Sequence, residues 1–293
     1  MSETIFITGA SGHLGGAVIK HLLARGVAAE RIVAGSRNPE KLQHLTESGV
    51  AVRRADFDDT QGLASTFKGA DTVLIISTDE LTADGHRLRQ HRNAVEAAVV
   101  AGVQRIAYTS LPNPTASPLS FAPDHALTEQ AIAETGLPSL VFRNGWYHEN
   151  LLMGLPSALQ SGHWYTASEG AKTAYAARDE MAEAIAAALA DPPAGSKTYT
   201  LTGSEALSVD AIASLVRDAT GRPLEVVNVT DEQLAQGLAA ANVPQAIVKL
   251  LVSVEAAARS GSLATVTGDL EFLIGRPGKS LAAFIEESAA LLS

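Results

Sequence analysis

Three glycines at three-residue spacing near the N-terminus form the pattern that most directly indicates chemistry. They follow the apolar run Ile5–Ile7, and residues 17–23 after them are predicted to be helical. A strand that turns into a helix points backbone N–H groups and the positive end of the helix dipole at one place, which suits a pyrophosphate. Glycine permits the tight turn, the approach of phosphates to the backbone, and close packing of helix on strand. The turn therefore predicts dinucleotide binding by Gly9, Ser11, Gly12, His13, Leu14 and Gly15, and an ordinary strand–helix turn is the alternative.

The end of the second predicted strand, residues 31–35, indicates which dinucleotide binds. Proteins that bind NAD usually place Asp or Glu there, where the carboxylate accepts hydrogen bonds from the ribose 2′-OH. This chain has Gly35-Ser36-Arg37-Asn38 instead. A carboxylate would repel a 2′-phosphate, whereas Arg37 can hold it with charge-assisted hydrogen bonds. We therefore expect NADP(H) as the cofactor, and a solvated surface arginine is the alternative.

Further polar and aromatic residues follow the next predicted strands. Asp56 and Phe57 come after the strand at 50–55 and are placed to meet adenine; as an alternative, Asp56 caps the next helix. Ile76 and Ser77 end the strand at 71–77 and are expected to lie under the nicotinamide ribose. Two more candidates complete this cofactor set: Thr109, and His91, for which a solvated helix face is the alternative.

The segment Asn144-Gly145-Trp146-Tyr147 follows a predicted strand at 139–143. Open α/β sheets bind ligands just past the carboxyl ends of their strands. Two aromatic residues beside a glycine offer a flat surface for stacking on a planar ring. We expect this segment, together with Phe121, to bind the substrate, and aromatic packing between two lobes is the alternative.

These residues lie on an alternating series of predicted strands and helices. Strand and helix alternate five times within about 110 residues, which is typical of a parallel, doubly wound sheet with right-handed crossovers. The sequence therefore predicts an α/β fold, a Rossmann-like sheet with a smaller C-terminal α+β lobe. We expect an NADP-binding domain at 1–150, to which elements of 172–204 return, and a substrate-binding lobe at 151–293.

Composition excludes several other classes of protein. A formal net charge of −10 disfavours nucleic acid and anionic membranes as partners. The absence of cysteine excludes disulfides, zinc–thiolate sites and thiol catalysis. No stretch is apolar for the length of a membrane span, no His, Asp and Glu have metal-ligand spacing, and the first residues lack a basic leader. We expect a cytoplasmic protein with a small-molecule substrate; whether it forms a homodimer is left open.

Four segments together resemble one family. They are Thr8–Gly15, Ser36–Pro39, Ala107–Ser110 and Arg143–Tyr147, and they look like the atypical short-chain dehydrogenases of the NmrA-like group. Within it they look closest to the bacterial NAD(P)H:quinone oxidoreductase type 2 and triphenylmethane reductase proteins. The resemblance extends to Pro277 and implies a Rossmann domain, NADPH without flavin, a 2′-phosphate contact at Arg37 and a substrate pocket at Trp146 and Tyr147.

The chain departs from ordinary short-chain dehydrogenases at their acid–base pair. Those enzymes place Tyr-x-x-x-Lys after the fifth strand, but no lysine here lies four residues after a tyrosine. Phe121 and His125 occupy that region, and His125 and Asn144 are our candidate catalytic residues. A structural role for His125 is the alternative. Quinone reduction needs a positioned acid less than alcohol dehydrogenation does, because solvent can protonate the phenolate product.

The sequence thus predicts an NADPH-dependent, flavin-independent reductase of quinones or similar electron-poor aromatic compounds. Two alternatives remain: an NADP(H)-sensing regulatory protein without turnover, and a reductase of triphenylmethane or azo dyes.

Overall fold

Seven strands form one sheet in the computed structural model, which describes residues 3–80 and 85–292. Their order across the sheet is β11 (Lys197–Leu201), β6 (Ser139–Asn144), β5 (Arg105–Ser110), β4 (Thr72–Ile75), β1 (Ile5–Ile7), β2 (Ile32–Ser36) and β3 (Ala51–Arg54). The pairings from β3 through to β6 are parallel. Strand order runs outward from β1 on both sides, so the winding reverses between β1 and β4. This confirms the predicted Rossmann-like sheet, and the reversal marks the place where such sheets bind ligands.

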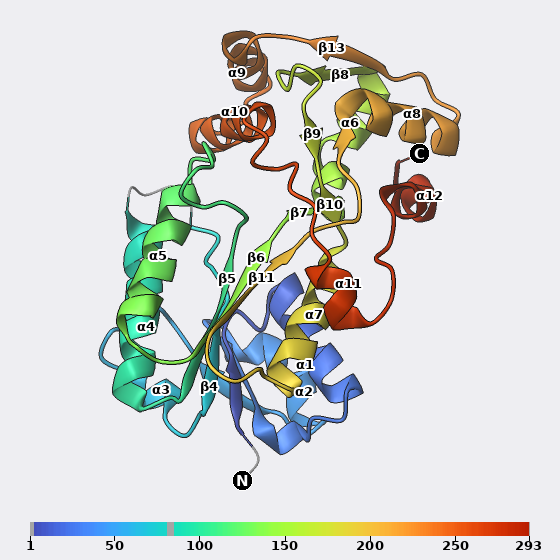
Figure 1. Ribbon diagram of the computed structural model, residues 1–293. Helices are drawn as coiled ribbons and strands as arrows, with labels where there is room; N and C mark the ends of the chain where they lie inside the picture. The colour runs from blue at the N-terminus through green and yellow to red at the C-terminus, as the bar shows by residue number, and fades with distance from the viewer. Residues whose placement is uncertain (1–2, 81–84, 293) are drawn as a thin grey trace. The chain divides into compact units, whose positions relative to one another are not determined.

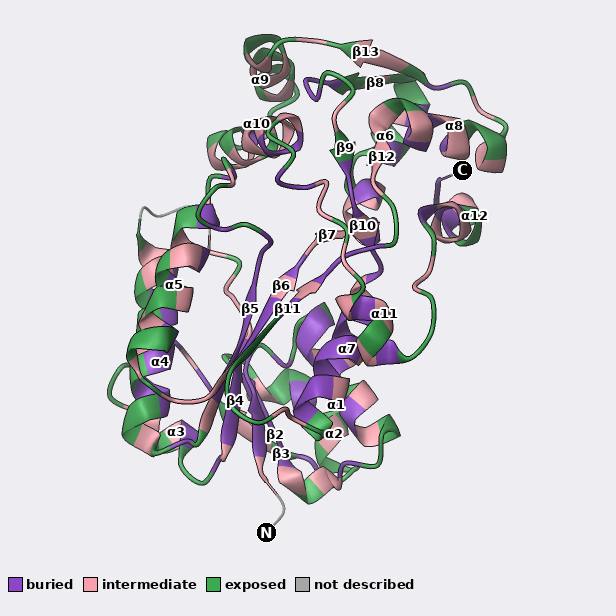
Figure 2. Ribbon diagram, in the orientation of Figure 1, coloured by how far each residue is buried: buried purple, intermediate pink, exposed green. Residues whose placement is uncertain are grey.

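Helices cover both faces of this sheet (Figure 1). On one face lie α3 (Leu63–Phe67), α4 (His86–Ala101) and α5 (Ala122–Glu134), and on the other lie α1 (His13–Ala24), α2 (Gln43–Thr46) and α7 (Arg178–Ala190). Every residue of β1, β2 and β4 is buried, as Figure 2 shows in purple. Such uniformly apolar strands are expected where helices cover both faces. Short 3₁₀ helices, η1 (Ala29–Arg31) and η2 (Pro39–Leu42), flank β2.

The chain divides into two compact units. The first takes residues up to Leu111, then Pro123–Arg143 and Met181–Tyr199; the second takes Pro112–Ala122, Asn144–Glu180 and the residues from Thr200 onward. The predicted division at residue 150, with 172–204 returning to the first domain, stays a prediction. No helix among the described residues is long and apolar enough to cross a membrane.

The second unit is built from short elements. Its paired strands are β7 (Trp146–Tyr147) with β10 (Tyr175–Ala176), β9 (Lys172–Thr173) with β12 (Leu207–Ser208), and β8 (His163–Thr166) with β13 (Glu225–Asn228). Its helices are η3 (His148–Met153), α6 (Leu155–Ser161), α8 (Val209–Thr220), α9 (Asp231–Ala240), α10 (Gln245–Arg259), α11 (Asp269–Ile274) and α12 (Leu281–Leu292). Leu155, Ile212 and Ile285 share one apolar core there.

Local sequence sets the ends of several helices. Ser208 accepts a hydrogen bond from the Ala211 N–H at the start of α8, and Gly221 ends that helix in the left-handed conformation. Thr230 and Gln233 form a capping box at the start of α9. The Asn38 side chain, just before η2, makes no capping hydrogen bond.

Candidate cofactor and substrate sites

The glycine turn between β1 and α1 is shaped by close backbone contacts. Gly9 has φ +60°, and a Cβ on Gly15 would lie 2.5 Å from the Gly9 carbonyl oxygen. A Cβ on Gly12 would lie 3.3 Å from the same oxygen. The first turn of α1 carries no acidic residue, and no side chain caps it at Gly12. A helix start with these features suits an external anion, so the turn fits the pyrophosphate of a dinucleotide.

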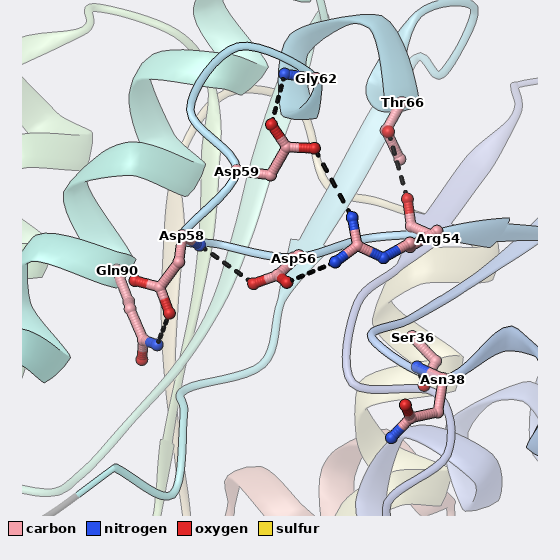
Figure 3. Close-up of polar contacts among 9 residues, drawn as sticks. All are labelled: Ser36, Asn38, Arg54, Asp56, Asp58, Asp59, Gly62, Thr66 and Gln90. Atoms are coloured by element: carbon pink, nitrogen blue, oxygen red, sulfur yellow. Dashed lines mark hydrogen bonds and ion pairs between the residues drawn. The ribbon is translucent and has the colours of Figure 1, made fainter.

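The end of β2 has hydroxyls and a cation. Ser36 Oγ accepts the Asn38 N–H at 3.1 Å, and Figure 3 draws both residues. The same Oγ lies 2.8 Å from Ser11 Oγ. The side chain of Arg37 is 64% exposed and lies 3.7 Å from the still more exposed carboxylate of Asp79. An ion pair this exposed is weak, so Arg37 can exchange it for a phosphate.

Carboxylates gather beyond β3, in the turn that leads into α3 (Figure 3). Asp56 accepts a hydrogen bond from Arg54 at 2.8 Å and one from the Asp58 N–H at 3.1 Å. Asp59, and not Asp56, accepts the Gly62 N–H before α3, so the interpretation of Asp56 as that helix cap is wrong. Phe57 is buried in the core. Its contact with adenine, like that of Asp56, stays a prediction.

Three consecutive backbone amides just after β4 each donate to a side chain. The pairs are Ile76 N–H with Thr8 Oγ1 at 2.8 Å, Ser77 N–H with Thr109 Oγ1 at 2.9 Å, and Thr78 N–H with His91 Nε2 at 3.1 Å. The Ile76 side chain lies 3.4 Å from the position that a Cβ on Gly9 would take. The structure thus brings five predicted cofactor residues together: Gly9, Ile76, Ser77, His91 and Thr109. Sequence reasoning missed Thr8, the hydroxyl residue just before the first glycine.

The two candidate histidines, His91 and His125, lie in the core of the first unit. His91 is fully buried, so the interpretation of a solvated helix face is wrong. His125 is 3% exposed, with Nε2 2.9 Å from the Arg87 guanidinium and Nδ1 2.7 Å from the Tyr108 hydroxyl. Burial, and next the Arg87 charge, lower the pKa of His91 to about 3 and hold the pKa of His125 well below its usual range. Both rings are therefore neutral.

Sequence reasoning also missed Arg87 and Tyr108. In α4, Arg87 and His91 continue the helical spacing of the buried residues Ala94 and Ala98 toward the N-terminus. The continuation of this stripe by two turns toward the N-terminus was the available signal for a buried polar cluster. It was missed because arginine and histidine are not apolar residue types.

The predicted substrate segment lies in the second unit. The Gly145 N–H donates to the Leu201 carbonyl at 2.8 Å, and a Cβ on Gly145 would lie 3.0 Å from that oxygen. Trp146 and Tyr147 form β7 and are half-buried. The Arg178 guanidinium carbon lies 4.8 Å from the Tyr147 ring centroid, a cation–π contact that holds the ring in place. Phe121, just before α5, is also half-buried.

Asn144 has a polar atom without a partner. The residue is 8% exposed, and its Nδ2 donates to the Tyr147 hydroxyl at 3.3 Å. Its Oδ1 is buried and has no hydrogen-bond partner among residues 3–80 and 85–292. Turning the amide over would leave Nδ2 in that position, so one polar atom stays unsatisfied in either orientation. Such an atom fits a site for a ligand with a polar group.

An ion pair supports β6, the strand that ends at Asn144. Arg143 binds both carboxylate oxygens of Glu129, at 3.0 and 2.6 Å, and the Ser110 hydroxyl donates to the same carboxylate at 2.5 Å. These contacts join the carboxyl ends of β5 and β6 to α5. No group of three or more His, Asp or Glu that could hold a metal ion occurs in the described part of the chain.

Comparison with known proteins identifies the family. The model of the NmrA-like family matches residues 1–271. The chain belongs to this family. As a member, it is 37% identical to quinone oxidoreductase 2 of Escherichia coli over 95% of this chain and 96% of that protein.

Two solved structures are also similar to this NmrA-like protein. The NADPH-dependent quinone oxidoreductase from Escherichia coli, complexed with NADPH, has a TM-score of 0.92 and 36% identity, and the match covers 97% of this chain and 99% of the other. The Citrobacter triphenylmethane reductase complexed with NADP(H) has a TM-score of 0.91 and 32% identity, with 98% and 100% covered. The predicted family and fold are confirmed.

Proposed function

We propose that the protein is an NADPH-dependent, flavin-independent reductase of quinones or similar electron-poor aromatic compounds. The observation that carries the proposal is the uncapped start of α1 behind the Gly9–Gly15 turn, with Arg37 and no carboxylate at the end of β2. The similarity to quinone oxidoreductase 2 of Escherichia coli supports the substrate class.

The geometry of the first unit supports the following proposed cofactor contacts. The backbone at Gly12, His13, Leu14 and Gly15 binds the pyrophosphate, with Ser11 beside it. Arg37 binds the 2′-phosphate, and Asp56 and Phe57 lie at the adenine. Ile76 and Ser77 support the nicotinamide ribose. When bound, NADPH supplies the hydride for reduction.

The substrate contacts lie on the segment that ends β6. Trp146 and Tyr147 offer ring faces to a planar substrate, and Phe121 adds apolar surface. Gly145 lets the backbone run close to β11. With its amide turned over, Asn144 accepts the Tyr147 hydroxyl through Oδ1 and donates from Nδ2 to the substrate oxygen, at the position whose polar atom has no partner in the described chain. The protein thereby contributes positioning and desolvation.

Protonation of the product is left to solvent. Arg87 can only donate, so it occupies the acceptor nitrogen of His125, and the other ring nitrogen contacts Tyr108. We expect His125→Ala to lower turnover by much less than the 10²–10⁴-fold typical of a lost general acid. A loss of that full size with unchanged NADPH affinity would make His125 the acid and contradict this step.

A direct assay tests the proposal. NADPH oxidation is followed by absorbance with the purified, flavin-free protein and a benzoquinone, a naphthoquinone or a triphenylmethane dye. We expect acceptor-dependent oxidation that is faster with NADPH than with NADH. The 32% identity to triphenylmethane reductase favours the dye as a second candidate substrate. Tight NADPH binding without oxidation by any acceptor would favour the regulatory alternative.

Two further expectations stay predictions, a cytoplasmic location and the absence of a nucleic-acid partner, and a homodimer is left open.

A further inference from the structure

Five buried side chains form a connected polar cluster in the first unit, which we call the Tyr108 cluster. Its members are Arg87 and His91 of α4, Tyr108 of β5, and His125 and Thr128 of α5. Each is at most 7% exposed. Polar groups this deep require hydrogen bonds, so their arrangement is constrained. A hydrogen bond from the Thr78 N–H to His91 Nε2 joins the cluster to the candidate cofactor site.

The direction of each hydrogen bond follows from its partners. The Thr78 N–H can only donate, so His91 Nε2 carries a lone pair and its proton lies on Nδ1. His91 Nδ1 lies 3.0 Å from Thr128 Oγ1 and 3.3 Å from the Tyr108 hydroxyl oxygen. The Thr128 hydroxyl itself donates to the Asp124 carbonyl at 2.6 Å. It therefore accepts from His91.

The position of the proton on the His125 ring also follows from its partners. Because the Arg87 guanidinium can only donate, His125 Nε2 accepts and Nδ1 carries the proton. That Nδ1–H donates to the Tyr108 hydroxyl oxygen at 2.7 Å. The Tyr108 oxygen thus lies between the N–H groups of two imidazoles. Burial raises the pKa of Tyr108, so the phenol stays neutral.

We propose that Tyr108 is a positioning residue of the cofactor site: its oxygen shares the His91 Nδ1–H with Thr128, and the two together hold His91 in the tautomer and orientation that bind the Thr78 amide. This proposal rests on the proposed function. Through that bond Tyr108 fixes the backbone at 76–78, where the nicotinamide ribose is bound. Thr8 and Thr109 hold the two preceding amides with hydroxyls from β1 and β5. The third amide depends on an imidazole, and so on the cluster behind it.

The charge in the cluster supports this role. Arg87 is the permanent cation beside both rings, and the Asp124 carboxylate lies 3.9 Å from it. Its charge and the burial of the rings disfavour imidazolium, which would have no lone pair for the Thr78 N–H. The cluster therefore keeps His91 able to accept.

Three substitutions test the proposal in the full chain. Tyr108→Phe removes one hydroxyl, His91→Leu removes the acceptor for Thr78, and His91→Gln keeps an acceptor oxygen. We expect Tyr108→Phe and His91→Leu to raise the NADPH dissociation constant by about 3–10-fold, the size of one lost hydrogen bond. His91→Gln should stay within about twofold of the wild type, since it retains that bond. The quinone KM measured at saturating NADPH should not change.

Hydrogen exchange of the Thr78 amide, measured without cofactor, gives a second readout. Exchange should be faster in Tyr108→Phe and His91→Leu than in the wild type, and His91→Gln should restore protection. His148→Leu is the matched control, because His148 is also buried but lies in the second unit. There its ring centroid lies 5.0 Å from that of Phe284. The control variant should leave the NADPH dissociation constant unchanged, whichever way its melting temperature moves.

The outcomes separate this proposal from the proposed function. If the wild type does not bind NADPH, the proposed function is wrong. If the wild type binds and Tyr108→Phe binds equally well, with only its melting temperature lowered, Tyr108 is structural and the positioning role is wrong. Equal losses of affinity in His91→Gln and His91→Leu would also overturn it, because the acceptor would then not be what matters.

Discussion

The Gly9–Gly15 turn offers backbone N–H groups to a ligand, whereas the Asn144–Tyr147 segment offers side chains. In the turn, glycine is required at Gly15, where a Cβ would collide with backbone atoms, and is favoured at Gly9, where φ is +60°. In the segment, the Asn144 amide and the rings of Trp146 and Tyr147 are the groups that can touch a ligand. Around the turn, side chains such as Thr8 and Thr109 serve to hold backbone amides.

This difference determines how each region responds to mutation. A backbone site is damaged by adding atoms or by releasing the side chains that hold it. A side-chain site is damaged by removing atoms. Substitutions in the turn should therefore affect NADPH, and those in the segment should affect the second substrate.

The largest effect is expected from Gly15→Val. Its Cβ would lie 2.5 Å from the Gly9 oxygen and 2.9 Å from the Ala10 Cα, and neither backbone atom can move away cheaply. Isothermal titration should detect no NADPH binding. Gly237→Ala is the control: its Cβ meets open space in α9, so it should stabilise the fold by about 0.5–1 kcal/mol. Normal NADPH binding by Gly15→Val would refute a backbone site.

Acid should destabilise both units of the chain, because each contains a buried histidine. Burial lowers the pKa of His91 to about 3 and of His148 to about 4, from an ordinary 6.5. Below pH 6.5 these histidines are protonated in the unfolded chain but stay neutral in the folded chain. Their contribution to the free energy of unfolding is therefore present above pH 6.5 and is lost as the pH falls. Between pH 7 and pH 5 each histidine should cost about 2 kcal/mol of unfolding free energy.

Urea titrations at the two pH values measure this loss. His91→Gln and His148→Gln should each remove about 2 kcal/mol of it, since each deletes one buried imidazole, and the part due to the buried His125 should remain. An unchanged pH dependence in either variant would show that its imidazole does not resist protonation in the fold.

Arg37→Asp tests cofactor choice at the end of β2. Loss of the charged hydrogen bonds should weaken NADPH binding by about 1.5–3 kcal/mol, or roughly ten- to a hundredfold. NADH binding should change little. Lys68→Asp, an exposed charge reversal in the same unit, controls for the change in net charge. Equal losses for NADPH and NADH would remove Arg37 from the 2′-phosphate.

The smallest effect is expected from Trp146→Ala. Stacking on a planar quinone contributes roughly 0.5–1.5 kcal/mol beyond area burial, so the quinone KM should rise several-fold. The NADPH dissociation constant and the melting temperature should move little. If Trp146 is instead a packing anchor, its loss would cost about 3–5 kcal/mol of stability and weaken both ligands together.

The sheet and the glycine turn could be predicted because they depend on local patterns. Apolar runs bounded by turn residues predicted strands that correspond to β1, β2, β3, β4 and β6 of the main sheet. Residues at the carboxyl ends of parallel strands must meet at one edge of the sheet. Gly9, Ser77 and Thr109 could therefore be grouped without knowledge of any side-chain contact.

Contacts that depend on tertiary packing could not be predicted. Arg87 and Tyr108 join His91 and His125 because α4, α5 and β5 pack in one register, which no local pattern specifies. The two-residue strands of the second unit are too short to show a period of two. The partnerless Asn144 atom is likewise a property of its surroundings.

Direct hydride transfer is the central claim, and isotope transfer tests it most directly. The flavin-free protein is mixed with a triphenylmethane dye and NADPH that is deuterated at C4 of the nicotinamide ring, and the product is analysed by mass spectrometry. We expect the rate of a single turnover to be slower with deuterated than with ordinary NADPH, and the product to carry deuterium on its central carbon. Bound NADPH that is not consumed, with either this dye or a quinone, would contradict this claim.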